Sequence, residues 1–186
     1  MGMKGILLSV CTNIVNTPLR IIDLINRIKL ARLKKSFVVK KESIIPQWAG
    51  EMATNDGHKY QEVHDRDWLQ WNLDYNLNGY PQDVQSYYSI YDKNTGEPCG
   101  FFLTKERYEE EAGPYKDVVK GTVCEWAYNT STLCEADIHL LAISTFSSNV
   151  FYINAISVES DSIKKFKSMG FVRHGNFQMS FLDKKN

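Results

Sequence analysis

Two side chains able to move protons lie close together in one β-rich stretch of the sequence. Glu125 and Tyr128 belong to the segment 118–128, whose Val, Thr, Trp and Tyr content predicts a strand. A carboxylate can accept a proton and a phenol can donate one, so the two side chains could perform acid and base catalysis. The simpler interpretation makes Glu125 a solvated or salt-bridged strand residue and Tyr128 a packing residue. Both interpretations remain open.

Cysteine and histidine spacing gives no sign of a metal site. The sequence contains no C-x-x-C pair and no H-x-x-x-H motif. The residues concerned are Cys11, Cys99, Cys124, Cys134, His58, His64, His139 and His174. We therefore predict no metal, reduced and mostly buried thiols, and histidines that are partly exposed polar residues.

The composition is that of an ordinary globular protein with balanced charge. The chain has 186 residues, with 22 basic and 22 acidic side chains, so no overall field favours nucleic acid. The apolar run 6–10 is too short for a secretory signal, and no run approaches the length of a membrane span. We expect one main domain, no nucleic-acid partner, no membrane span and a cytoplasmic location.

The first third of the chain contains a basic amphipathic segment. Thr17 followed by Pro18 predicts a helix start, and the helix is expected to run to about Lys35. Its apolar face is formed by Ile21, Ile22, Leu24, Ile25, Ile28 and Leu33. Its polar face carries six cations against the single acid Asp23. Such a helix can lie on an anionic membrane, but packing on its own domain or on a partner is the favoured interpretation.

Strands and helices alternate through the rest of the chain. The expected elements are strand 37–41, a helix from Pro46, a helix from Asp65, strands 84–91 and 99–104 around the turn DKNTGEP, loop 108–117, strand 118–128, helix 135–147, strand 150–158, a helix from Ser160 ended by Gly170, and strands around Phe177, Met179 and Phe181. This order indicates an α/β (α+β) domain in which helices flank a mixed sheet.

This order of elements resembles the GNAT acyl-CoA N-acetyltransferase superfamily. Two local sequences sharpen the resemblance: YDKNTGEPCGFFL is similar to the family's hairpin, and KKFKSMGF (164–171) to its late helix ending in Gly-Phe. RDWLQWNL near Asp67, followed by this hairpin, is similar to the divergent halves of tandem GNAT-like proteins. The resemblance covers residues 36–183. It implies a GNAT-like domain at 36–186, with a mostly antiparallel sheet, after an N-terminal helical extension at 1–35.

The resemblance also implies a function and a set of site residues. It implies transfer of an acyl group from acetyl-CoA or another acyl-CoA to a small amine, such as an amino sugar or an aminoacyl group. The cofactor is expected in a gap between 124–137 and 150–158, where two parallel strands separate. On this basis Glu125 would be the general base, and Tyr128 the proton donor or the group that binds the thioester carbonyl. The expected cofactor-binding residues are Trp126, Ala127, Thr130, Ser131 and Asn154.

Three positions depart from the family pattern. The pyrophosphate motif Q/R-x-x-G-x-G/A is replaced by NTSTLCEAD (129–137), without glycine and with two carboxylates that oppose a bound anion. Phe166 stands where many members have a proton-donating Tyr, and Glu159 where they often have Asn. These departures predict weakened or lost activity. The alternative hypothesis is a non-catalytic GNAT-fold domain that binds a partner, as a homo-oligomer or with a second GNAT-like domain.

Overall fold

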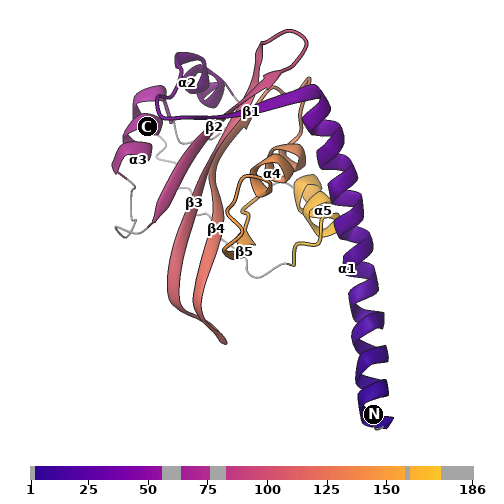
Figure 1. Ribbon diagram of the computed structural model, residues 1–186. Coiled ribbons are helices and arrows are strands. Elements are labelled where there is room, and N and C mark those ends of the chain that lie inside the picture. Colours follow the sequence, from indigo (N-terminus) through magenta and orange to yellow (C-terminus); the bar gives the residue numbers. More distant parts are fainter. Residues whose placement is uncertain (1–2, 56–63, 76–82, 158–159, 173–186) are drawn as a thin grey trace, which may run out of the picture.

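The computed structural model describes residues 3–55, 64–75, 83–157 and 160–172, and the described strands form one twisted sheet (Figure 1). The strands are β1 (Phe37–Glu42), β2 (Val84–Asp92), β3 (Pro98–Ala112), β4 (Tyr115–Tyr128) and β5 (Val150–Asn154). They lie side by side in chain order. Neighbouring strands are antiparallel except β4 and β5, which run parallel. The predicted mixed, mostly antiparallel sheet is therefore confirmed.

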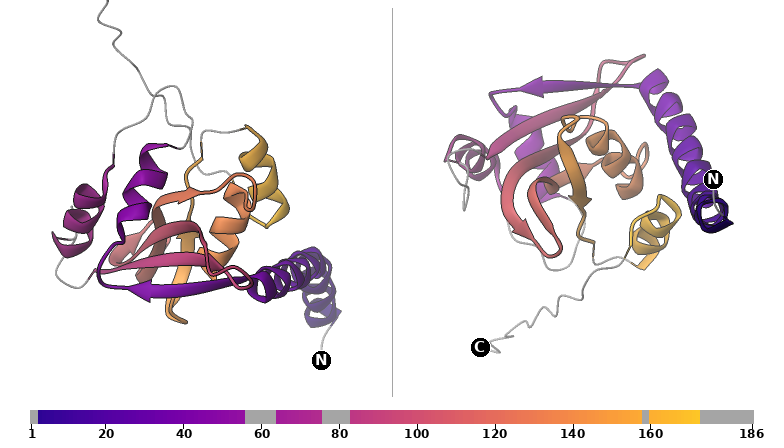
Figure 2. Two further views of the ribbon diagram at one scale, coloured as in Figure 1. Left: turned by 90° about the horizontal axis from the view of Figure 1, so that it is seen from above. Right: turned by 60° about the horizontal axis from the view of Figure 1, so that its bottom comes forward.

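Helices cover both faces of this sheet. They are α1 (Met3–Ser36), α2 (Gln47–Thr54), α3 (Arg66–Tyr75), α4 (Glu135–Ile143) and α5 (Ser160–Ser168). Helices α2 and α3 lie on one face, whereas α4, α5 and the C-terminal half of α1 lie on the other (Figures 1 and 2). The parallel pair β4 and β5 is joined through α4, as a parallel connection requires.

The sheet divides the hydrophobic core into two layers. Successive strand residues point to opposite faces, so Phe101 enters the layer under α2 and α3, whereas Phe102 enters the layer under α4. The first layer contains Ile45, Ala49, Leu69, Tyr87, Phe101 and Ala127. The second contains Ile90, Cys99, Phe102, Val123, Leu133, Ile138, Leu141 and Ala142. Strand β4 contributes Val123 to one layer and Ala127 to the other, as β3, the middle strand of the sheet, does with Phe102 and Phe101.

The first helix begins earlier than the sequence pattern predicts. Helix α1 extends from Met3 to Ser36, with Pro18 inside it, so the expected start at Thr17 is wrong. A proline at this position removes one backbone donor and weakens one turn. Because the helix continues on both sides of Pro18, the pair Thr17-Pro18 does not mark the beginning of this helix.

The inner side of α1 packs on its own domain. Leu30 and Leu33 pack against both the α4 layer and the α4–α5 cluster. The Asn26 side-chain amide donates to the carbonyl of Met169 at 2.9 Å. The predicted packing on the chain's own domain is confirmed for this side. Among the described residues, no helix has the length and apolar character needed to cross a membrane.

The predicted loop 108–117 is wrong, because β3 and β4 continue through it as a long two-stranded ribbon. Only Gly113 and Pro114 form the turn, with Gly113 at a φ of 62°. Three of the acidic residues, Glu109 to Glu111, are consecutive in β3, and Glu109 pairs with Lys120 of β4 at 3.2 Å. An acidic composition suggested a loop, but cross-strand pairing of this kind stabilises a strand.

Two of the remaining described elements differ in length from expectation. Helix α4 and strand β5 are shorter than predicted, ending at Ile143 and Asn154. Gly170, expected to cap α5, has a φ of 96°. The strands expected around Phe177, Met179 and Phe181, together with His58, Glu159 and His174, lie outside the described residues.

One glycine fixes the spacing of α2 and α3, and its replacement gives a first test of the fold. A Cβ on Gly50 would lie 2.4 Å from the backbone nitrogen of Arg66. We expect Gly50→Ala to lower the free energy of unfolding by about 3 kcal/mol, because the helices must separate. Urea denaturation measures this loss. The control is Gly96→Ala, where φ is 75° and a Cβ meets open space. In that control the free energy of unfolding should fall by only about 1 kcal/mol, because of backbone strain alone. Equal losses in the two variants would contradict the packing argument.

Candidate active site

The two parallel strands separate part-way along β4. Their pairing runs from Val119 opposite Val150 to Thr122 opposite Asn154, and it stops there. Strand β4 continues to Tyr128, whereas β5 has already ended (Figure 1). Among the described residues, no strand pairs with the edge of β4 that faces β5 beyond Thr122. The family resemblance predicts the cofactor gap at this place, between the end of β4 and the segment that follows β5.

A β-bulge lies where the strands separate. Val123 is opposite Thr104 and Glu125 is opposite Leu103, which leaves Cys124 as the extra residue. The bulge shifts the alternation of side chains, so that Val123 and Trp126 both face the α4 layer. Ala127, and Glu125 two positions before it, face the α2 and α3 layer instead.

Glu125 is held by a histidine that sequence reasoning did not identify. The Nδ1 of His64 and the Oε2 of Glu125 are 3.0 Å apart. The ring of His64 stacks on Trp68 with centroids 3.6 Å apart and planes 5° apart. The side chains of His64 and Glu125 remain 16% and 25% exposed, respectively. Glu125 thus shares a hydrogen bond with His64, and its carboxylate still reaches solvent.

The spacing of His64 and Trp68 was the only sequence signal for this arrangement. Residues four apart meet along a helix or across its first turn. Asp65 accepts from the backbone nitrogen of Trp68 at 2.8 Å and so caps the start of α3. That cap brings His64 over Trp68. The pairing with Glu125 joins positions 61 residues apart, which local spacing could not reveal.

The other predicted catalytic residue lies on the opposite face of the sheet. Tyr128 is opposite Gly100 in the register and packs against the α4 layer, as does Trp126. Glu125 and Tyr128 therefore flank the same stretch of β4 but point to different sides. The structure places them around one strand edge without direct contact between the two side chains.

The predicted cofactor-binding residues occupy different parts of the gap. Asn154 is the last residue of β5 and is opposite Thr122. The side chain of Ala127 is buried under α2, so only its backbone can reach the gap. Thr130 and Ser131 are exposed in the loop before α4. The Ser131 amide and hydroxyl donate to the side chain of Asn129 at 3.0 and 2.7 Å.

The loop before α4 satisfies much of its own hydrogen bonding. The amides of Thr132 and Leu133 both donate to the carbonyl of Asn129 at 3.0 Å. The Cys134 amide donates to the carboxylate of Asp137 at 3.1 Å, which forms a cap at the helix start. Because these donors are occupied within the chain, an incoming phosphate must compete with Asn129 and Asp137 for them.

A second carboxylate joins the two walls of the gap. Glu135 is only 5% exposed at the start of α4. Its Oε2 accepts from the Ser157 hydroxyl at 3.1 Å, and Ser157 follows β5. The negative charge that a helix N-terminus attracts is thus already supplied by Glu135 and Asp137.

His139 is a buried neutral side chain, so its predicted exposure is wrong. Its Nδ1 donates to the carbonyl of Glu135 at 2.9 Å, and the residue is fully buried. The imidazole makes edge contacts with Trp126 and Phe166, at centroid distances of 4.8 and 4.6 Å. Burial lowers the pKa of His139 to about 4. Phe166, at the family's tyrosine position, is a core residue of this cluster.

The described cysteines are free thiols, as predicted. Cys99 is buried, whereas Cys124 and Cys134 are partly buried. Burial raises the pKa of Cys124 to about 11, so the thiol is protonated at neutral pH and is not activated as a nucleophile. The side chain of Cys11 lies outside the described part of the chain. Within that part, no cluster of three or more potential ligands could hold a metal ion.

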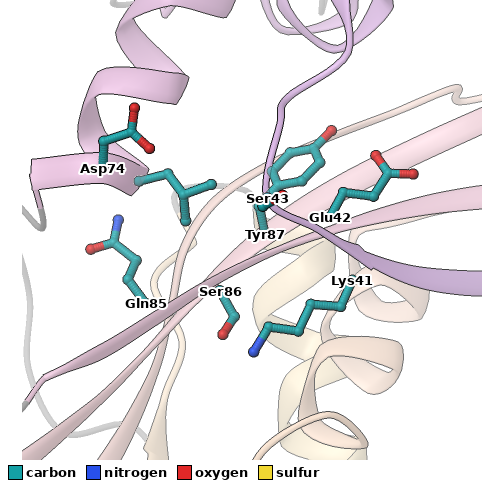
Figure 3. Close-up of a pocket in the computed structure, with 8 residues that line it drawn as sticks. Lys41, Glu42, Ser43, Asp74, Gln85, Ser86 and Tyr87 are labelled. Atoms are coloured by element: carbon teal, nitrogen blue, oxygen red, sulfur yellow. The ribbon is translucent and has the colours of Figure 1, made fainter.

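A separate open hollow of about 420 Å³ lies at the other end of the sheet, between α3 and the strands β1 and β2 (Figure 3). It is lined by Lys41, Glu42, Ser43, Leu73, Asp74, Gln85, Ser86 and Tyr87. The polar groups there are largely paired: Glu42 accepts from Ser89 at 2.8 Å, and Gln85 donates to Asn72 at 3.1 Å. This hollow belongs to the first strands rather than to the gap beside β4.

Comparison with solved structures identifies the architecture. No protein-family model matches the sequence, and no curated protein sequence matches it. Glucosamine-6-phosphate N-acetyltransferase from Arabidopsis thaliana is similar in structure, with a TM-score of 0.54 and 8% identity over 80% of this chain and 99% of that one. A GNAT family acetyltransferase from Staphylococcus aureus is also similar, with a TM-score of 0.50 and 15% identity over 79% of this chain and 99% of that one. The chain has the GNAT fold.

The GNAT fold alone does not fix a function for this chain. A protein described as a transcriptional regulator from Bacillus halodurans is also similar, with a TM-score of 0.51 and 12% identity over 78% of this chain and 99% of that one. Sequence identities this low show shared architecture, and function must be argued from the site itself.

Burial of His139 makes the stability of the protein depend on pH. Its pKa is about 4 in the folded state and 6.5 in the unfolded chain, so the unfolded state binds a proton first as pH falls. We expect this group to reduce the free energy of unfolding by about 2 kcal/mol between pH 7.5 and 5, with the loss continuing to about pH 4. Urea denaturation at both pH values measures the change. The variant His139→Phe lacks the group, and an undiminished pH dependence in that variant would contradict the assignment.

Proposed function

We propose that this chain is a divergent member of the GNAT superfamily that transfers an acyl group from acyl-CoA to a small amine. The observation that carries the proposal is the separation of β4 from β5 beyond Thr122 and Asn154. An acyl-CoA has an extended arm with amide groups, which can pair with β4 beyond the end of its pairing with β5, as an added strand would. The thioester would then lie beside the bulge at Cys124.

The opposite orientations of Glu125 and Tyr128 suit the two proton transfers of this reaction. The acceptor would approach from the α2 and α3 side, where Glu125 takes a proton from the ammonium group. The free amine attacks the thioester carbonyl carbon and forms a C–N bond. The C–S bond then breaks, and the thiolate takes a proton from the Tyr128 hydroxyl on the α4 side. The nitrogen loses its second proton to solvent as the amide forms, and the Tyr128 phenolate regains a proton from solvent. His64 would position the Glu125 carboxylate through their 3.0 Å contact.

The main obstacle to acyl-CoA binding is the occupied loop before α4. Asn129 and Asp137 already accept hydrogen bonds from its amides, and Glu135 adds a second negative charge. We therefore propose that the arm and the acyl group provide most of the binding energy. Recognition of the pyrophosphate would be weak. This matches the weakened activity expected from the missing glycines.

A non-catalytic partner-binding domain is the second candidate function. The loop before α4 favours this candidate, because its backbone amides already donate hydrogen bonds to Asn129 and Asp137 and need no ligand. Phe166 also favours it, because the phenyl ring packs against His139 and cannot protonate a thiolate. A homo-oligomer or a second GNAT-like domain would be the partner. The two candidates differ in whether acyl-CoA binds at all.

Neutralising one carboxylate at the start of α4 tests acyl-CoA binding directly. We expect acetyl-CoA to bind, and Asp137→Asn to tighten that binding about two- to fivefold, because one repulsive charge leaves the helix N-terminus. Isothermal titration calorimetry with acetyl-CoA and longer acyl-CoAs measures both affinities. The matched control is Asp161→Asn at the start of α5, which should leave them unchanged. Absence of heat with every acyl-CoA, in the wild type and in the variant, would favour the partner-binding candidate.

Replacement of the proposed base separates chemistry from cofactor binding. We expect Glu125→Gln to lower kcat about 100-fold and to leave the affinity for acetyl-CoA unchanged, because the amide cannot accept the ammonium proton. Release of free CoA thiol, measured with a panel of amino sugars and other small amines, reports the rate. Glu111→Gln, an exposed carboxylate on β3, is the control. Unchanged turnover in Glu125→Gln would remove Glu125 as the base.

A further inference from the structure

Helix α1 carries an apolar stripe on the side turned away from its own domain. The side chains of Ile21, Leu24, Ile25 and Ile28 are 53%, 57%, 43% and 47% exposed. Their spacing of three, four and seven positions places them on one line along the helix. We call them the outward stripe. The domain is contacted instead by Ile22, Asn26, Leu30 and Leu33, on a different side of the helix.

Basic residues flank the outward stripe. Between residues 17 and 36 the exposed cations are Arg20, Arg27, Lys29, Arg32, Lys34 and Lys35. The same stretch has one acid, Asp23, and that acid is paired with Arg27 at 2.9 Å. Helix α5 lies beside α1 and carries the exposed lysines Lys164, Lys165 and Lys167, of which Lys164 pairs with Asp161 at 3.1 Å (Figure 1). The outer surface of α1 is therefore both apolar and strongly positive.

The helix extends well beyond the domain. Its N-terminal half projects away from the sheet and from the other helices (Figures 1 and 2). In the sequence of that half, residues 3–16, Lys4 is the only charged residue, and Ile6, Leu7, Leu8, Val10, Ile14 and Val15 are apolar. An apolar helical arm thus leads directly into the outward stripe and its cations.

We propose that α1 docks the protein on an anionic lipid surface, with the outward stripe in the headgroup boundary and the flanking cations at the lipid phosphates. An interfacial helix needs this combination of an apolar face and Lys or Arg at its sides. Because the stripe and the domain-packing side chains occupy different sides of α1, the helix can lie flat while the sheet stays in water.

Charge decides between a lipid surface and a second copy of the chain. Two copies joined through the outward stripe would bring six cations of one helix against six of the other, with one acid each. The like charges on the two facing helices would repel each other. An anionic surface attracts the same residues, and each Lys or Arg near it strengthens binding about fivefold. The basic flanks therefore fit lipid phosphate and oppose self-pairing.

Vesicle co-sedimentation of the full chain tests this proposal. We expect the protein to pellet with vesicles of phosphatidylcholine mixed with phosphatidylglycerol, and much less with phosphatidylcholine alone. Added salt should release it, because the attraction between exposed charges is screened. Replacing Arg20 and Arg32 with Gln should lower the partition coefficient about 25-fold. The double variant Leu24→Ser, Ile28→Ser should lower it at least tenfold, because less apolar area is buried in the headgroup boundary.

Matched variants elsewhere on the surface serve as controls. Lys40→Gln with Lys116→Gln removes two exposed cations of the sheet, and Ile44→Ser with Val84→Ser removes two exposed apolar residues. Both controls should partition as the wild type does. Circular dichroism should show nearly the same thermal midpoint for the stripe variant, since Leu24 and Ile28 are about half exposed and lie on a different side of α1 from Ile22, Asn26, Leu30 and Leu33.

Three results would overturn the proposal. Equal binding to neutral and anionic vesicles would remove the role of the cations, and a stripe variant that still partitions would remove the role of the stripe. A concentration-dependent dimer in light scattering that Leu24→Ser abolishes, without vesicle binding by the wild type, would identify the stripe as a contact between copies of the chain.

Discussion

The separation of β4 from β5 is the constraint on which the candidate site depends. At the paired end, Gly121 allows close packing, since a Cβ there would lie 3.0 Å from both Phe146 and Val150. Beyond Thr122 the bulge at Cys124 turns β4, whereas β5 has already ended at Asn154, opposite Thr122. Close packing at one end and loss of pairing at the other together open the gap. A larger residue at position 121 would disturb the pairing that defines it.

The chain has filled part of this gap with its own polar groups. Asn129, Glu135 and Asp137 replace the open loop that an anion would need, and Ser157 links one of them to the other wall. Such internal hydrogen bonds stabilise the folded protein, and a ligand must exchange them for its own. The same residues that hold the walls in place therefore limit how tightly a phosphate can be held.

Local patterns predicted the order of elements because strand alternation, helix caps and Gly170 depend on neighbouring residues. They failed where distant residues decide the structure. The ribbon at 108–117 depends on pairs such as Glu109 with Lys120, and the burial of His139 depends on Trp126 and Phe166 from other elements. The parallel pairing of β4 with β5 agrees with the family resemblance, and the cofactor gap beside it stays a prediction. The contact of His64 with Glu125 was not, because it joins a helix start to a strand.

The C-terminal end of α1 is clamped to the hairpin between β2 and β3. Lys93 donates its backbone amide to Ser36 at 2.8 Å and its ammonium group to the carbonyl of Lys34. The helix of 34 residues is about 50 Å long, and its weakened turn at Pro18 lies between the far end and the outward stripe. Attachment through the outward stripe, on the clamped side of Pro18, therefore sets the tilt of the sheet as well as its location. The candidate site beside β4 would then face a fixed direction relative to the surface to which α1 is attached.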